Sequence, residues 1–168
     1  MIRYKVLLPV AVLAMLAGCS DSTTTTTKKT EEAAKPAEPV GGLKATYQMF
    51  AAARAWSPDI EVLSVRNVPV AGVPAVPGKA GAWEAVFVSA SKGRAKTYTY
   101  SVVEAGGSLH KGVFPGADQA WSGPRGQTKP FAMQALKIET DEALKAAMEK
   151  AHDYAKKNPD KPINFIAE

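Results

Sequence analysis

Residues 82–103 read AWEAVFVSASKGRAKTYTYSVV, and this stretch decides the fold. Large apolar residues recur at alternate positions on both sides of a Ser-Lys-Gly sequence at 91–93, a pattern typical of two half-buried strands joined by a turn. The alternating positions are Trp83, Ala85 and Phe87 before the turn and Tyr98, Tyr100 and Val102 after it. The sequence therefore predicts an antiparallel hairpin with strands at 82–90 and 94–103.

A helix is predicted before this hairpin, at 43–56, because residues recur there at steps of three and four. The members of this stripe are Leu43, Tyr47, Phe50, Ala51 and Arg54. Pro58 ends the helix, since proline disfavours the helical conformation of the residue before it. The β-branched residues of 60–68 predict a strand, whereas 69–78 contains three prolines and predicts a loop or a sheet edge.

The segment after the hairpin supplies a third strand and a second helix. A Gly-Gly turn leads into a strand at 108–114, which completes a three-stranded antiparallel meander. The other expected elements are a long loop at 115–130, a strand at 131–138, a helix at 140–157 that begins at Thr140 or Asp141, and a final strand at 163–166. The second helix has an apolar stripe at Leu144, Ala147, Met148, Ala151 and Ala155. These elements predict an α+β fold with a helix packed on the meander.

Composition excludes several functional classes. The 168 residues are 46% apolar and 22% charged, which is ordinary for a folded chain of about one domain. Net charge is +5, and without Arg3 and Lys5 nineteen basic residues face sixteen acidic ones, an excess too small to indicate nucleic-acid binding. One cysteine and two histidines predict neither a disulfide framework nor a metal site, and no cofactor motif is found.

The first nineteen residues, MIRYKVLLPVAVLAMLAGC, have the pattern of a targeting segment. Two basic residues precede an apolar run at 6–16, which is shorter than the roughly 20 residues that cross a bilayer. The sequence Leu-Ala-Gly-Cys at 16–19 resembles the lipobox of bacterial lipoproteins. The resemblance implies a signal peptide at 1–18 and a lipid anchor on Cys19. In Gram-negative members of that class, Ser20 after the cysteine favours the outer membrane, facing the periplasm.

Residues 19–42 predict a disordered linker behind the lipidated cysteine. The segment contains five consecutive threonines, two prolines and mixed charges but one large apolar residue, so it buries too little surface to fold. As a flexible coil, residues 20–42 would span roughly 25–30 Å. We therefore expect a folded domain at 43–168 that is held off a membrane surface.

A partial repeat is visible within the folded part. Each predicted helix is followed by a Pro-Asp pair, at 58–59 and 159–160, and then by a strand. The second unit, from about 140, has no hairpin, so its strand either completes the first sheet or belongs to an incomplete unit. Residues 51–59, the hairpin and 140–144 (TDEAL) together resemble the PepSY-like domains of bacterial secreted proteins and lipoproteins. The resemblance implies a non-catalytic module, of a kind that in some cases restrains peptidases.

Catalytic motifs are scarce. Ser89-Ala-Ser-Lys92 matches the Ser-x-x-Lys pattern of serine acyl-enzymes, but it lies at a strand end and the chain has no Ser-Asp-Asn or Lys-Thr-Gly partner motif. Turn formation is the alternative interpretation. His110 and His152 have no neighbours at metal-ligand spacing, so we interpret both as surface residues. The sequence therefore predicts no catalytic residue and no metal ligand.

Two groups of residues are predicted to bind a partner. Lys92, Arg94 and Lys96 cluster at the hairpin tip and can attract anionic lipid or an acidic protein, or simply keep a strand edge solvated. Trp121 and Arg125 lie in the long predicted loop, where Trp121 either anchors a partner or folds back as core.

We consider three functions from this sequence. The first is a lipid-anchored envelope module, without enzymatic activity, that binds or restrains another envelope protein such as a peptidase through an exposed strand edge. The second is an enzyme acting on the cell wall, and the third is a passive lipoprotein that binds peptidoglycan. The oligomeric state and the partner's identity stay open.

Overall fold

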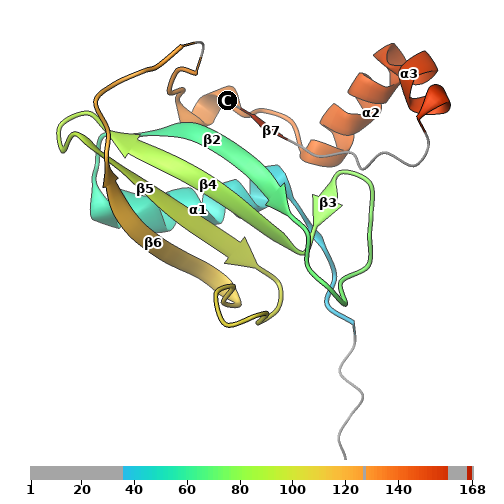
Figure 1. Cartoon of the computed structure of the whole chain (residues 1–168), viewed down its shortest axis with the longest axis horizontal. Helices are drawn as coiled ribbons and strands as arrows, with labels where there is room; N and C mark the ends of the chain where they lie inside the picture. Colours follow the sequence, from blue (N-terminus) through green and yellow to red (C-terminus); the bar gives the residue numbers. More distant parts are fainter. Residues whose placement is uncertain (1–35, 127, 159–165, 168) are drawn as a thin grey trace, which may run out of the picture. The chain divides into compact units, whose positions relative to one another are not determined.

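The computed structural model describes residues 36–126, 128–158 and 166–167. The chain divides into two units, 1–34 and 35–168, and every described residue belongs to the second. Its elements are β1 (Val40–Gly41), α1 (Gly42–Trp56), β2 (Ile60–Val68), β3 (Lys79–Ala80), β4 (Ala82–Ser89), β5 (Arg94–Ser101), β6 (Gly112–Ala120), a 3₁₀ helix (Met133–Ala135), α2 (Thr140–Lys150), α3 (His152–Lys157) and β7 (Ile166–Ala167) (Figure 1). The predicted α+β class is confirmed, whereas the predicted signal peptide, Cys19 and residues 20–35 lie outside the described residues.

The sheet is antiparallel, with strand order β6-β5-β4-β2-β7. The predicted hairpin forms its centre, with Trp83 opposite Tyr100 and Ala85 opposite Tyr98. Gly93 closes the turn with φ 59°, a left-handed conformation that glycine adopts without steric cost. Strand β2 has the predicted bounds, and β7 pairs with its outer edge, so the final strand completes the first sheet. A separate two-stranded ladder joins β1 to β3.

Helix α1 packs against β2, β4 and β5 on one face of the sheet (Figure 1). Its fully buried apolar residues are Ala45, Met49 and Ala53, each 0% exposed, and of the predicted stripe only Leu43 and Phe50 pack against the core. Tyr47, a member of that stripe, is 48% exposed. Small side chains on α1 leave room for the large residues of the sheet, and Phe87 fills the space, with its ring 6.0 Å from that of Phe50.

Two predictions after the hairpin were wrong. The third strand begins at Gly112 and continues to Ala120, so most of the predicted strand at 108–114 is a turn and the first part of the predicted loop at 115–130 is sheet. Strand β6 accommodates Pro115 because it lies at the edge of the sheet, and its register shifts opposite Thr97, where two residues face one. Gly and Pro therefore suggested a loop where the chain forms an irregular edge strand.

The C-terminal part also differs from the prediction. Residues 131–138 form no regular strand: Phe131 makes a single bridge to Val62, and a short 3₁₀ helix follows. The predicted helix at 140–157 is divided at Ala151 into α2 and α3. Its apolar stripe stays largely in contact with water, since Leu144 and Met148 are half-buried and Ala147 is exposed. Residues 163–165 lie outside the described range.

Candidate functional site

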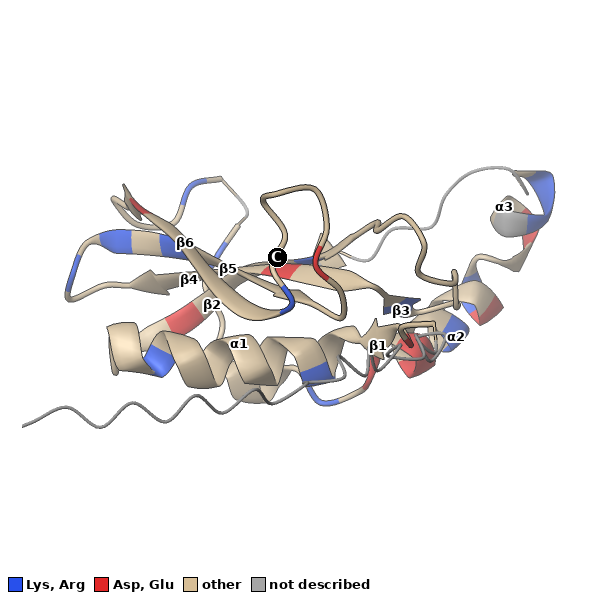
Figure 2. Cartoon of the chain, turned by 90° about the horizontal axis from the view of Figure 1, so that it is seen from below, with Lys and Arg blue, Asp and Glu red and all other residues tan. Residues whose placement is uncertain are grey.

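The three basic residues of the hairpin tip have different environments. Figure 2 colours Lys and Arg blue, and blue segments gather on the ribbon at the end of the sheet that contains the β4–β5 turn. Lys92 is exposed in this turn, and Arg94 is half-buried. Lys96 lies on the α1 side of the sheet, where its amine is 3.2 Å from Asp118 and 5.9 Å from the ring centroids of Trp56 and Tyr98. The structure therefore places Lys96 in a cluster between α1 and the edge strand, and leaves Lys92 as the exposed cation of the tip.

Asp118 links the edge strand to the end of α1. One carboxylate oxygen accepts a hydrogen bond of 3.1 Å from the indole nitrogen of Trp56, and the other faces Lys96. Burial raises the pKa of Asp118, but the hydrogen bonds from Lys96 and Trp56 and the positive charges of Lys96 and Arg94 outweigh it, so the pKa is lower than usual.

Ser89, the residue that suggested an acyl-enzyme, is buried in a polar network. Its hydroxyl donates to Asp59 over 2.6 Å and accepts from the backbone N–H of Lys92 over 3.2 Å. Ser57 and the backbone N–H of Ser91 also donate to Asp59. Hydrogen bonds from Ser57, Ser89 and Ser91 hold the pKa of Asp59 far below its usual value. The network joins the α1–β2 turn to the β4–β5 turn, a geometry that favours the turn interpretation of Ser89.

The structure brings Trp121 beside the hairpin tip. Its backbone N–H donates to the carbonyl of Gly93 over 2.9 Å. Its side chain is half-buried, which is intermediate between the exposed anchor and the core residue that were the two predicted alternatives. Arg125 is exposed, and its guanidinium donates to the hydroxyl of Ser122 over 2.9 Å. The tip, Trp121 and Arg125 thus lie at the end of the sheet where β6 finishes.

Strand β6 forms one outer edge of the sheet. It pairs with β5, and no second neighbour borders it among the described strands. The residues at 114–120 are exposed, including Phe114, which is 43% exposed and lies 4.2 Å from the ring of His110. An edge of this kind presents unpaired backbone donors and acceptors to a partner chain.

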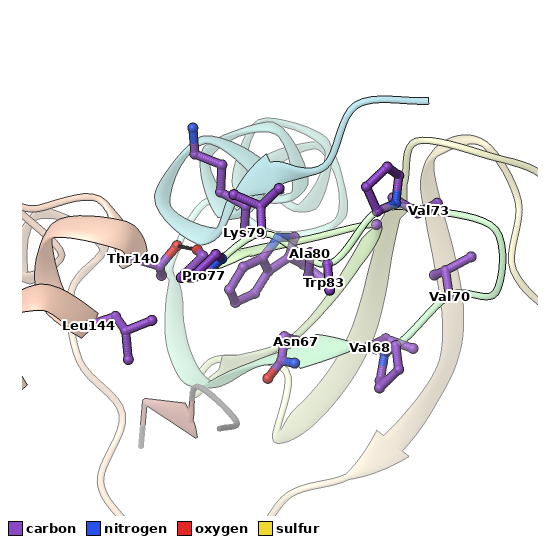
Figure 3. A pocket seen from close by; sticks show the side chains of 16 residues that line it. Asn67, Val68, Val70, Val73, Pro77, Lys79, Ala80, Trp83, Thr140 and Leu144 are labelled. Carbon is purple, nitrogen blue, oxygen red and sulfur yellow. Dashed lines mark hydrogen bonds between the residues drawn. The ribbon is translucent and has the colours of Figure 1, made fainter. Parts of the chain in front are cut away.

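A cavity of about 560 Å³ lies between the loop at 69–78 and the start of α2 (Figure 3), and none of its lining residues belongs to β5 or β6. Its walls are mainly aliphatic and include Val68, Val70, Val73 and Leu144, and Trp83 lies at its base. Apart from the indole of Trp83, only Asn67, Lys79 and Thr140 among its sixteen lining residues have polar side chains. The volume is within the range of roughly 300–1,000 Å³ that is common for small-molecule sites.

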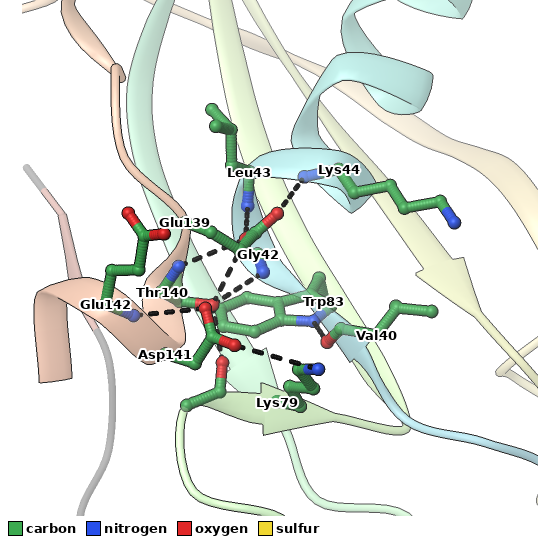
Figure 4. Close-up of polar contacts among 11 residues, drawn as sticks. Val40, Gly42, Leu43, Lys44, Lys79, Trp83, Glu139, Thr140, Asp141 and Glu142 are labelled. Atoms are coloured by element: carbon green, nitrogen blue, oxygen red, sulfur yellow. Dashed lines mark hydrogen bonds and ion pairs between the residues drawn. The ribbon is translucent and has the colours of Figure 1, made fainter. Parts of the chain in front are cut away.

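A hydrogen-bonded clamp holds the two walls of this cavity together (Figure 4). The hydroxyl of Thr140 donates to the carbonyl of Gly78, at the end of the loop, and accepts from the N–H of Gly42 over 2.7 Å. Gly78 has φ +73°, and a Cβ there would lie 2.3 Å from the Cα of Asp141, so glycine is required at this contact. The indole of Trp83 donates to the carbonyl of Val40 over 2.9 Å.

The same clamp caps α1. Gly41 offers no side chain at the N-cap position, and the carboxylate of Glu139 instead accepts from the N–H groups of Leu43 (2.7 Å) and Lys44 (3.2 Å). Glu139 also accepts from Thr140 over 3.0 Å, and so it caps α2 as well. Negative charge at a helix N-terminus is favourable because unpaired N–H groups and the helix dipole point there. The sequence analysis missed both the cavity and the clamp; the prolines and glycines of 69–81 were their one local signal.

No helix in the described part of the chain is both long and apolar enough to span a bilayer. No three His, Cys, Asp or Glu side chains of the described ranges come together as metal ligands do.

No protein-family model, curated protein sequence or solved structure matches this chain.

Proposed function

We propose that this chain is a lipid-anchored, non-catalytic module of the bacterial cell envelope that binds another envelope protein by adding one of its strands at β6. The lipobox-like sequence ending in Cys19 supports the anchor, and the linker would let the folded body reach a partner near the membrane. Anchoring on the periplasmic side of an outer membrane is the location that Ser20 favours in a Gram-negative cell.

The observation that carries the proposed binding mode is the exposed edge of β6. Strand addition uses the unpaired backbone groups of an edge for affinity and side-chain pockets for specificity. Pro115 lacks an N–H, and the register shift beside it interrupts the ladder, so the edge offers two short pairing segments at 112–114 and 118–120. The interruption therefore favours a partner strand with a matching irregularity and disfavours pairing with regular strands of other proteins.

The geometry around the hairpin tip suits such an interaction. Trp121 and the turn with Lys92 lie at the end of β6, where Arg94 is opposite Ala120. A half-buried tryptophan next to exposed cations is a surface that partner proteins commonly contact. An acidic segment after the added strand would meet Lys92 and Arg125, and the PepSY-like resemblance makes a restrained peptidase a suitable partner.

Site-specific photo-crosslinking tests this function. Benzoylphenylalanine placed at Gln119, on the exposed edge, should capture one protein in stoichiometric amount, whereas the same group at Lys145, exposed on α2, should not. Those backbone amides of 112–114 and 118–120 that point away from β5 should exchange more slowly with solvent in the purified complex, because the added strand pairs with them. Capture from Lys145 alone, or copurification of peptidoglycan fragments without a protein, would contradict strand addition at β6.

The anchor is tested separately. Changing Cys19 to Ser should move the protein from the membrane fraction to the soluble fraction, because the acyl chains that hold it would be absent. Mass spectrometry of the wild-type protein should find the acylated cysteine as its first residue. An unmodified Cys19 on an unprocessed chain would exclude the lipoprotein part of the proposal.

A further inference from the structure

The cavity beside Trp83 is independent of the β6 edge and has a chemistry of its own. The residues that form its walls are aliphatic or proline on the loop side, and Leu144 extends the apolar lining on the α2 side. Half-buried valines and exposed prolines around a concave site indicate a ligand that removes apolar surface from water. We propose that this cavity binds a single aliphatic chain with an anionic head group, as in a fatty acid.

The lining favours an alkyl chain over a peptide. A bound peptide requires hydrogen-bond partners for its backbone, but Pro69, Pro74 and Pro77 remove three N–H donors from the loop. Two other amides of this wall are already bonded within it: Val73 donates to Val70, and Lys79 donates to Val76. An alkyl chain needs no such partners, and its affinity rises with the apolar area that it buries.

Lys79 accounts for the anionic head group. It is the one charged residue among those that line the cavity, and its amine is 3.7 Å from a carboxylate oxygen of Asp141. Both side chains are 39% exposed, and an ion pair that is long and solvated contributes little stability. The amine can therefore turn toward the carboxylate of a ligand, whereas a neutral head group gains no charge attraction from it.

The walls are held in place before any ligand arrives. Prolines restrict the backbone of the loop, and the Thr140–Gly78 hydrogen bond fixes the end of the loop to the start of α2. Gly81 allows the loop to lie against the sheet, because a Cβ there would be 3.0 Å from the side chain of Val73. A preformed site loses less conformational entropy on binding, so more of the free energy gained from apolar burial remains as affinity.

Calorimetric titration with laurate and with dodecyl maltoside, both below their micellar concentrations, tests the inference. Each probe has one saturated alkyl chain of nearly the same length, and the head group is an ionised carboxylate in laurate and a neutral sugar in dodecyl maltoside. The full chain carrying Cys19→Ser is used, so that the protein has no acyl group of its own. We expect both to bind and laurate to bind more tightly. Failure of both probes to bind the folded protein would overturn the proposal.

Matched variants locate the site. Leu144→Glu on α2 and Val70→Glu on the loop each place a carboxylate in an apolar wall, and should weaken both probes by about tenfold or more, since a charge must be desolvated. Ala147→Glu and Ala71→Glu add the same charge at exposed positions outside the lining and should bind as the parent does. Circular dichroism checks that all four variants fold. Equal binding by lining and control variants would exclude this cavity.

Lys79→Gln separates the head group from the chain. It should weaken laurate by about twofold to fivefold, as expected for the loss of one exposed ion pair, and leave dodecyl maltoside unchanged. Unchanged affinity for laurate would remove the anionic part of the proposal, and loss of both probes would show that Lys79 acts on the fold of the loop. Neither result depends on a partner at β6.

Discussion

The helices α1 and α2 are stabilised in opposite ways. Helix α1 begins with two glycines, has no acidic residue in its first turn and yet buries five residues, from Gly42 to Ala53. Helix α2 has Glu139 as its cap, two acidic residues in its first turn and Lys150 in its last, but of its residues Thr140 alone is buried. Packing on the sheet therefore determines α1, whereas local interactions determine α2.

Methionine side chains on the two helices allow this contrast to be measured. Met49 on α1 is 0% exposed, whereas Met148 on α2 is half-buried. Met49→Ala should lower the free energy of unfolding by about 2–5 kcal/mol, because it leaves a cavity under the sheet. Met148→Ala should lower it by less than about 1 kcal/mol, as surface substitutions do. Urea unfolding followed by circular dichroism measures both.

Similar losses for the two variants would contradict the contrast. Such losses would mean that the apolar stripe of α2 is buried in solution as one face of α1 is. A larger loss from Met148→Ala would reverse the assignment of which helix belongs to the core.

Glu139 joins the two helices, and its removal should have the next largest effect. Glu139→Ala deprives α1 and α2 of a cap at once, and each lost cap costs about 0.5–2 kcal/mol. Amides of Leu43 and Lys44, which donate to this carboxylate, should exchange faster with solvent. Unfolding experiments and hydrogen exchange measure the two effects.

The control for this variant is Glu149→Ala. Glu149 is an exposed residue of α2 with the same side chain, away from both helix starts. It should leave the amides of α1 unchanged. Faster exchange in α2 alone after Glu139→Ala would show that the long-range cap contributes nothing to α1.

The sequence predicted elements whose signal is local. Strand β2 follows from its β-branched residues, the central hairpin follows from alternating apolar residues, and the end of α1 follows from Pro58. The buried face of α1 was predicted only in part: Leu43 and Phe50 pack against the core, whereas Ala45 and Ala53 are too small to mark a stripe. The third strand was predicted to end too early, at 114, because Pro115 and Gly116 are tolerated at an edge, and edge position is a property of the whole sheet.

The candidate sites show the same division. Trp121 and Lys92 were predicted to be near a binding surface from the turn and loop that contain them, and they lie at one end of the sheet. The cavity depends on Thr140 meeting Gly78 across 62 residues, and the cap of α1 depends on Glu139 meeting Leu43 across 96. Such contacts leave no periodic or local signal in one sequence, so the structure was needed to find them.

The turns that follow the helices also differ, and a substitution in the turn after α1 should change the free energy of unfolding least at neutral pH. Asp59, after α1, accepts hydrogen bonds from Ser57, Ser89 and Ser91, whereas the corresponding pair after α3, Pro159 and Asp160, lies outside the described residues. Those bonds hold the pKa of Asp59 below its ordinary value, so its carboxylate stabilises the folded state above pH about 3.9. This contribution decreases as pH falls below that value and through the folded-state pKa.

The unfolding free energy of the wild-type protein should therefore fall more steeply below about pH 4 than that of Asp59→Asn, whose amide does not titrate in this range. The variant retains the decrease that comes from Glu104 and Asp118, whose pKa values are also lowered. Asp153→Asn on α3 is the control, since Asp153 is exposed and has one contact of 3.4 Å with His152. Parallel pH curves for wild type and Asp59→Asn would show that the serine network does not stabilise the ionised carboxylate, and the turn after α1 would then be held by Pro58 and packing alone.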